Sequence, residues 1–125
     1  MFPPKAGQRY VLVIEDDAPL RELYRTALRA ARFPVVAVED GLDALHHIEA
    51  SKPSAVVLDL DLPRVSGRDV YRELKGSPTT FHIPIIVVSG KDASDLNPEH
   101  FACILRKPIS ADELILAVRT ACETT

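Results

Sequence analysis

Five short apolar runs, separated by stretches with helical periodicity, constrain the fold of this chain more than any other feature. Each run has the length of a strand, and its apolar character is almost continuous, which is typical of strands covered on both faces. Strands of that kind belong to parallel sheets, so the runs predict a parallel sheet of five strands. The runs are YVLVI (10–14), VVAV (35–38), AVVL (55–58), IIVV (85–88) and ACIL (102–105).

The stretches around these runs predict helices. Apolar residues recur at amphipathic-helix spacing between the first two runs. A second helix is predicted from Gly41, with Asp40 as its N-cap, and a third over 67–75. The last begins after Ser110, which has capping-box spacing with Glu113. The side chains expected to face the core are Leu20, Leu23, Tyr24, Ala27, Leu28 and Ala31 in the first helix, Leu42, Leu45 and Ile48 in the second, and Leu114, Ile115, Val118 and Ala121 in the last.

The connection between the fourth and fifth runs predicts only a short helical segment, because Pro98 interrupts it. Parallel strands joined by helices cross over right-handed, so five such units give a doubly wound sheet with helices on both faces. At 125 residues the chain has the size of one domain. We therefore expect a flexible N-terminal segment at 1–8 and one folded domain over 9–123.

Acidic side chains follow two of the predicted strands at the point where each strand ends. Glu15, Asp16 and Asp17 come directly after the first run, and Asp59 follows the third. Ligands of doubly wound sheets bind at the carboxyl ends of the strands, so these acids are expected to meet at one edge. Their nearest alternative explanation is a solvated helix start, since acids favour the first turn of a helix. Ser89 and Lys107 follow the fourth and fifth runs at the same edge.

This set of groups predicts a cation site with phosphoryl chemistry. Two carboxylates about 4 Å apart repel by roughly 4 kcal/mol at an effective dielectric constant near 20, and a divalent cation removes that cost. Few, hard oxygen ligands on a shallow edge suit Mg²⁺. Asp59 can then act as a nucleophile, while Glu15, Asp16 and the backbone carbonyl of Asp61 hold the metal directly or through water. Ser89 and Lys107 are the expected partners of the phosphoryl oxygens.

With these residues the chain resembles the response-regulator receiver domains of two-component signalling, over about residues 9–122. VLVIEDDAPLR resembles the first strand and acidic pair of that family, VVLDLDLPRVSG its phosphoacceptor segment, IPIIVVSG its hydroxyl-bearing strand and RKPI its Lys-Pro. The resemblance implies a flavodoxin-like (βα)5 fold. This chain departs from it in the segment from Ser89 to Lys107, which is several residues short for the family and contains Pro98, so a shortened or irregular fourth helix is expected. It also implies a cis bond between Lys107 and Pro108, Mg²⁺ as cofactor, and phosphorylation of Asp59 by the phosphohistidine of a sensor histidine kinase or phosphotransfer protein.

One position departs from the family pattern, and two others concern the rate of dephosphorylation. The family usually carries an aromatic residue three positions before the lysine, and this chain has Ile104 there, which cannot perform the family's ring movement. Asp61 and Lys91 stand two places after Asp59 and Ser89, where the family tunes spontaneous dephosphorylation. We hypothesise that Lys91 pairs with Asp61 and screens the phosphoryl group from water.

Other classes of function stay open at this point. One is a pseudo-receiver, an interaction module that binds a cation but is not phosphorylated. Another is a haloacid-dehalogenase-type phosphatase, because LDLDLP resembles its DxD motif, although that motif should end the first strand. We expect a phosphoacceptor signalling domain and no enzyme, with at most self-phosphorylation from small donors and self-dephosphorylation, acting on a downstream protein by contact.

Composition narrows the partners and the compartment. The 15 basic residues are scattered among 18 acidic ones, with a net charge of −3, so no direct nucleic-acid partner is expected. No apolar run reaches the roughly 18 residues that cross a bilayer, so no membrane partner is expected either. Cys103 and Cys122 have no metal-ligand spacing and are interpreted as reduced thiols. These features favour a cytoplasmic protein.

Overall fold

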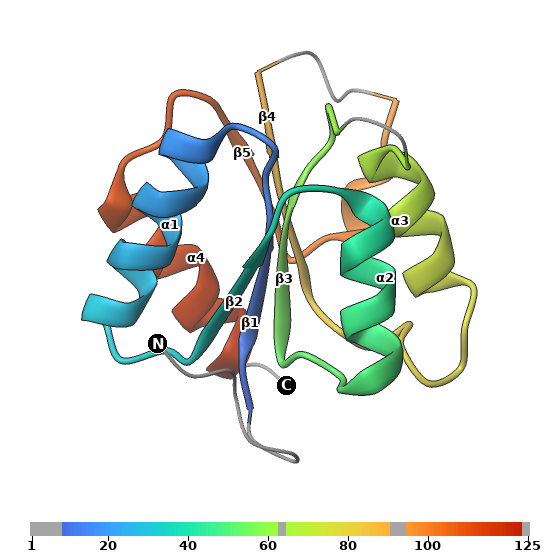
Figure 1. Ribbon diagram of the computed structural model, residues 1–125. Coiled ribbons are helices and arrows are strands. Elements are labelled where there is room, and N and C mark those ends of the chain that lie inside the picture. Colours follow the sequence, from blue (N-terminus) through green and yellow to red (C-terminus); the bar gives the residue numbers. More distant parts are fainter. Residues whose placement is uncertain (1–8, 63–64, 91–94, 124–125) are drawn as a thin grey trace.

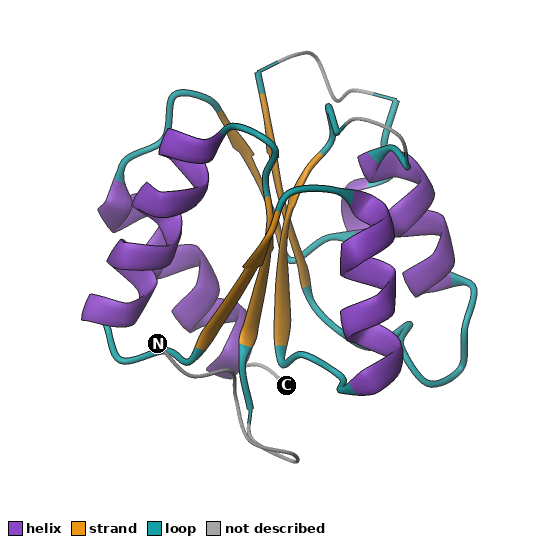
Figure 2. Ribbon diagram, in the orientation of Figure 1, coloured by secondary structure: helices purple, strands orange, loops and turns teal. Residues whose placement is uncertain are grey.

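The computed structural model describes residues 9–62, 65–90 and 95–123, which form alternating strands and helices (Figures 1 and 2). The order is β1 (Val11–Ile14), α1 (Ala18–Ala30), β2 (Val35–Val38), α2 (Gly41–Ala50), β3 (Ala55–Asp59), α3 (Gly67–Lys75), β4 (Ile85–Ser89), the 3-10 turn η1 (Pro98–His100), β5 (Cys103–Arg106) and α4 (Ala111–Glu123). The predicted segment at 1–8 lies outside the described residues.

The five strands form one parallel sheet in the order β2-β1-β3-β4-β5. The chain turns back at β1, which lies between β2 and β3, so the strand order reverses there. This is the flavodoxin-like order, and it confirms the predicted doubly wound fold. All strands run in one direction, and their carboxyl ends therefore lie together at one end of the sheet.

Helices cover both faces of the sheet, two on each (Figure 1). One face packs against α1 and α4 and the other against α2 and α3, and each layer has its own apolar core. The centres of β1, β3 and β4 are buried on both faces, as their continuous apolar runs predict. The largest fully buried apolar side chains are Leu12, Ile14, Leu28, Leu58, Leu74, Ile83, Ile85, Ile86 and Leu114.

The predicted helix starts are confirmed by their capping contacts. The Asp40 side chain accepts a hydrogen bond from the backbone N–H of Asp43 at 3.0 Å. Ser110 accepts one from the N–H of Glu113 at 3.1 Å. Asp17 caps α1 in the same way, so this acid serves the helix and is not a member of the site.

Two predicted core positions are wrong, because the buried stripe of each helix is displaced from its apolar pattern. Leu23 is 47% exposed and Leu42 is 41% exposed. In α1, Tyr24 points to the sheet, and Leu23 lies about 100° away around the axis. In α2 the buried stripe contains Gly41, which packs so closely that an added Cβ would lie 2.5 Å from the carbonyl oxygen of Val65. Small residues thus mark the contact face of α2.

β5 is an edge strand, and the expectation of burial on both faces is wrong for it. Its side chains alternate between half-buried and exposed, and Ile104 is 39% exposed. Between β4 and β5 the described residues form only η1, which agrees with the shortened fourth helix. The segment around η1 is tied to α3 by a bidentate ion pair of Arg68 with Asp95 and by packing of Tyr71 on Phe101.

Three further features bear on the predictions. The peptide bond between Lys107 and Pro108 is cis, as the resemblance implies. Cys103 and Cys122 are free thiols. No described helix is both long enough and apolar enough to cross a membrane.

Candidate functional site

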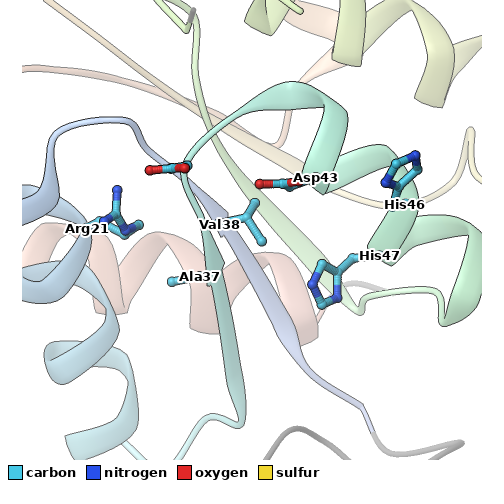
Figure 3. A pocket seen from close by; sticks show the side chains of 7 residues that line it. Arg21, Ala37, Val38, Asp43, His46 and His47 are labelled. Carbon is cyan, nitrogen blue, oxygen red and sulfur yellow. The ribbon is translucent and has the colours of Figure 1, made fainter.

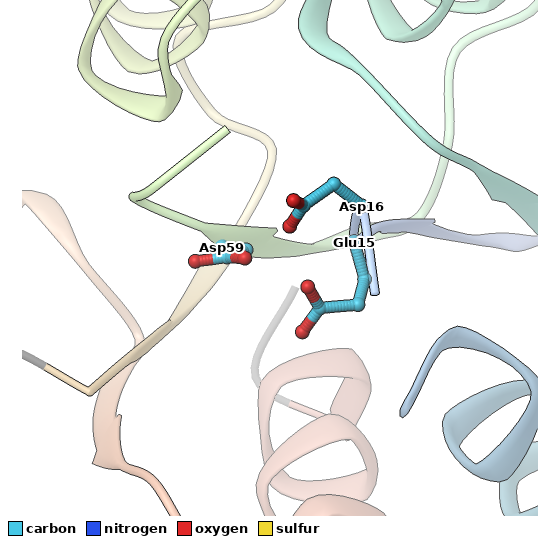
Figure 4. A group of neighbouring side chains, drawn as sticks. All are labelled: Glu15, Asp16 and Asp59. Atoms are coloured by element: carbon cyan, nitrogen blue, oxygen red, sulfur yellow. The ribbon is translucent and has the colours of Figure 1, made fainter. Parts of the chain in front are cut away.

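Three carboxylates meet where β1 and β3 end. β1 and β3 are neighbours in the sheet, and Ile14 pairs with Leu58. The next residue of each chain segment, Glu15 after Ile14 and Asp59 after Leu58, therefore lies beside the other. Each of Glu15, Asp16 and Asp59 offers an oxygen, and these oxygens lie within 4.8 Å of one another (Figure 4). The predicted meeting of the acids is therefore observed for these three residues.

Lys107 supplies the positive charge of the site from the loop after β5. Its Nζ lies 2.9 Å from Oε1 of Glu15 and 3.4 Å from Oδ2 of Asp59. Glu15 is 1% exposed and Asp59 is 3% exposed, whereas Asp16 is open to solvent. One cation thus faces two buried carboxylates, and a net negative charge remains where solvent can reach it.

Burial controls the ionisation of this group. The pKa of Glu15 is raised to about 7, chiefly because the side chain is buried and also because Asp59 is close, while Lys107 opposes the change. For Lys107, burial alone lowers the pKa, but contact with Glu15 and attraction to Asp59 outweigh burial and leave it raised. The ammonium of Lys107 therefore stays charged near neutral pH, whereas the carboxyl group of Glu15 gains or loses its proton there.

Glu15 should make the stability of the cation-free protein depend on pH. Its pKa is raised from 4.5 to about 7 on folding, so the folded chain holds a proton that the unfolded chain releases. Its stabilising contribution is fully present below about pH 4.5 and is lost as the pH rises through about 7. The loss is on the order of 3 kcal/mol at most.

Urea unfolding in EDTA, at several pH values across this window, measures the effect. Glu15→Gln has no proton to lose at this position, so its free energy of unfolding should decline less than that of the wild type. The same decline in both proteins would refute the assignment to Glu15.

The loop after β3 fixes the Asp59 carboxylate. The backbone N–H of Asp61 donates a hydrogen bond of 2.9 Å to Oδ1 of Asp59, so the other oxygen, Oδ2, faces Lys107. Gly67, the first residue of α3, packs directly on this segment. A Cβ added there would lie 2.4 Å from the carbonyl oxygen of Asp59 and 2.6 Å from Cα of Leu60. A glycine thus lets α3 approach the end of β3.

The remaining predicted site residues are placed as follows. Ser89 ends β4 and is buried, one residue beyond Val88, the pairing partner of Asp59. Its carbonyl accepts a hydrogen bond of 2.9 Å from the N–H of Lys107, which joins the ends of β4 and β5. The Asp61 side chain is exposed. Lys91, predicted to pair with Asp61, lies outside the described residues.

Arg21 and Gly67 contribute to the site and were not predicted from the sequence. Nη1 of Arg21, on α1, donates hydrogen bonds to the backbone carbonyls of Glu15 at 3.0 Å and Asp16 at 3.3 Å. The sequence signal for Gly67 is a glycine between the acceptor loop and a helical pattern. For Arg21 the only signal is its place one turn into the helix that follows the acids.

The donor set fits Mg²⁺. Lys107 is close to Oε1 of Glu15 but poorly aligned with it, so this buried oxygen has an ion-pair partner and no aligned hydrogen-bond donor among the described residues. An oxygen of this kind favours a cation as a further partner. Carboxylates with one open, solvent-facing side are the ligands of Mg²⁺ ions that keep several waters. The residues present therefore agree with the expected metal.

The strand order defines a flavodoxin-like domain, and a cluster of acidic residues lies at the C-terminal ends of its strands. Residues 11–119 match the family described as response regulator receiver domain. The chain belongs to this family, and it is a receiver domain of a response regulator, a signalling domain. The match lends no support to the haloacid-dehalogenase-type alternative.

Relatives and solved structures agree with this assignment. Response regulator MprA of Mycobacterium tuberculosis is 32% identical over 122 residues, covering 92% of this chain and 51% of that protein. The chain thus spans about half the length of the curated relatives it matches. A sensor protein from Polaromonas sp. JS666 has a TM-score of 0.83 at 27% identity, covering 94% of this chain and 98% of that one. The receiver domain of NtrX from Brucella abortus has a TM-score of 0.81 at 26% identity, covering 92% of this chain and 99% of that one.

Proposed function

We propose that this chain accepts a phosphoryl group on Asp59 from the phosphohistidine of a sensor histidine kinase or phosphotransfer protein, in a reaction that requires Mg²⁺. The observation that carries the proposal is the pairing of a buried Asp59 with two further carboxylates and one lysine at the carboxyl edge of the sheet. A cluster with this charge needs a cation, and a nucleophile beside it can accept a phosphoryl group.

In the proposed reaction a carboxylate oxygen of Asp59 attacks phosphorus. A P–O bond forms as the P–N bond to the donor imidazole breaks, and the imidazole nitrogen keeps the electron pair and takes up a proton. Asp61 holds the carboxylate by its backbone N–H during the attack. Glu15, Asp16, Asp59 and the backbone carbonyl of Asp61 would hold Mg²⁺, which would supply positive charge to the phosphoryl oxygens when bound.

Lys107 and Ser89 are the proposed partners of the transferred group. Lys107 already contacts Asp59 through Nζ, so it can move its ion pair from the carboxylates to a phosphoryl oxygen. Ser89, at the end of the neighbouring strand, would donate a hydrogen bond from its hydroxyl. The chain then acts as a phosphoacceptor and not as an enzyme for another substrate, and we propose that it works in the cytoplasm.

The phosphorylated chain would signal by contact with a downstream protein. Ile104 cannot provide the ring movement that the resemblance implies, so the change must reach the surface by another route. The withdrawal of Lys107 from Glu15 is one local event that the site supplies, because the lysine is shared between both acids.

Incubation with acetyl phosphate, followed by intact-mass spectrometry, tests the proposed reaction. We expect one added phosphoryl group in the presence of Mg²⁺ and none in EDTA, because the donor oxygens and the carboxylates repel without the cation. Mg²⁺ binding without phosphorylation, by acetyl phosphate and by phosphoramidate alike, would favour the pseudo-receiver instead.

A further inference from the structure

One arginine holds the backbone that carries the acidic pair. Nη1 of Arg21 bonds the carbonyl oxygens of two consecutive residues, Glu15 at 3.0 Å and Asp16 at 3.3 Å. The same loop is also restrained through Asp17, whose N–H donates to Oε2 of Glu15 at 3.3 Å and whose side chain caps α1, and through the N–H of Glu15, which donates to the carbonyl of Val38 at 3.1 Å. Arg21 is thus the contact that reaches both carbonyls from the helix.

These two carbonyls belong to the peptide groups on either side of Cα of Asp16. Two flanking peptide planes determine the φ and ψ angles of a residue, and they therefore determine the direction of its Cβ. The Asp16 carboxylate is exposed, and no hydrogen bond within the described part of the chain restrains it. Glu15 differs, since it is buried and paired with Lys107. The direction of Asp16 therefore depends on its backbone.

We propose that Arg21 is a positioning residue for cation binding, which directs Asp16 toward Asp59 by holding the two peptide groups around Asp16. The proposal rests on the proposed Mg²⁺ site and extends it to a residue outside the ligand set. Partners that orient metal ligands without touching the metal commonly change affinity by 10- to 100-fold.

The surroundings of Arg21 set the size of the expected effect. The arginine also lines a cavity of about 480 Å³ with residues of β2 and α2, and His46 and His47 lie on its far side (Figure 3). Its guanidinium is therefore partly hydrated, and hydrated contacts are weaker than buried ones. We therefore expect the loss of Arg21 to change Mg²⁺ affinity by an amount near the lower end of the 10- to 100-fold range.

Calorimetric titration of the unphosphorylated chain with Mg²⁺ tests the proposal. Arg21→Met keeps the aliphatic stem and removes the donors, and it should weaken Mg²⁺ binding roughly tenfold. Arg21→Lys keeps a charged donor and should recover part of that loss. Arg25→Met is the matched control, because it removes the same charge one turn further along α1, where Arg25 pairs with Glu22, and it should bind Mg²⁺ like the wild type.

The outcomes separate this proposal from the proposed function. Phosphorylation by acetyl phosphate should stay within about twofold of wild type in Arg25→Met, whereas the slower reaction of Arg21→Met should recover as the Mg²⁺ concentration approaches saturation. Equal Mg²⁺ affinity in Arg21→Met and wild type overturns the positioning role alone, as does reduced stability toward urea without a change in affinity. A wild type that binds no Mg²⁺ overturns the proposed metal site and this inference together.

Discussion

The Asp59→Asn variant is expected to take up no phosphoryl group from acetyl phosphate under conditions that fully modify the wild type. The amide is a far weaker nucleophile than a carboxylate, so we expect the rate to fall by at least about 100-fold. The substitution preserves the shape of the side chain, and its amide oxygen can still accept the Asp61 N–H that bonds Oδ1 of Asp59. The loss should therefore be chemical and not structural, and intact-mass time courses measure it.

Asp43→Asn is the matched control for this experiment. Asp43 belongs to another group of close carboxylates, with Glu39 and Asp40, at the end of β2. Removing one acid there should leave phosphorylation within about twofold of wild type. If Asp59→Asn were modified as fast as the control, Asp59 could not be the acceptor.

Gly67→Ala is expected to be the most destabilising small substitution in the acceptor region. The added methyl would lie 2.4 Å from the Asp59 carbonyl oxygen and 2.6 Å from Cα of Leu60, and both are backbone atoms of a buried segment that cannot rotate away. Overpacking typically costs 1–3 kcal/mol, and we expect about 3 kcal/mol here. The helix should shift from β3 and disturb the Asp59 carboxylate, so phosphorylation should also slow.

Gly90→Ala provides the comparison, because a Cβ at Gly90 meets nothing within 4 Å among the described residues. Its free energy of unfolding in urea should stay within about 0.5 kcal/mol of wild type. Equal stability of Gly67→Ala and Gly90→Ala would mean that α3 does not approach the end of β3 as closely as the structure has it.

Much of the fold can be predicted from the sequence, because its signals are local. Strand runs, the helix over 67–75 and the caps Asp40 and Ser110 depend on nearby residues, and all agree with the structure. The meeting of Glu15, Asp16 and Asp59 is also predictable, since parallel strands place their carboxyl ends together.

The remainder depends on packing between distant segments. Leu42 lies outside the contact face because Gly41 and Ala44 pack against the core instead, and an apolarity pattern ranks leucine above both. The exposed side chains of β5 reflect which elements cover that strand, since the described residues between β4 and β5 form only η1, and its apolar run does not encode this. The near-complete burial of Glu15 and the contacts of Arg21 likewise need the assembled sheet and helix.

The location of the phosphoryl group on the modified chain tests the account most directly. After reaction with acetyl phosphate and Mg²⁺, sodium borohydride reduces an aspartyl phosphate to homoserine, and peptide mass spectrometry then identifies the changed residue. We predict homoserine at position 59, and only in samples that contained Mg²⁺. Homoserine at another carboxylate, or a phosphoryl group that resists reduction on a different side chain, would contradict the assignment of Asp59 as the acceptor.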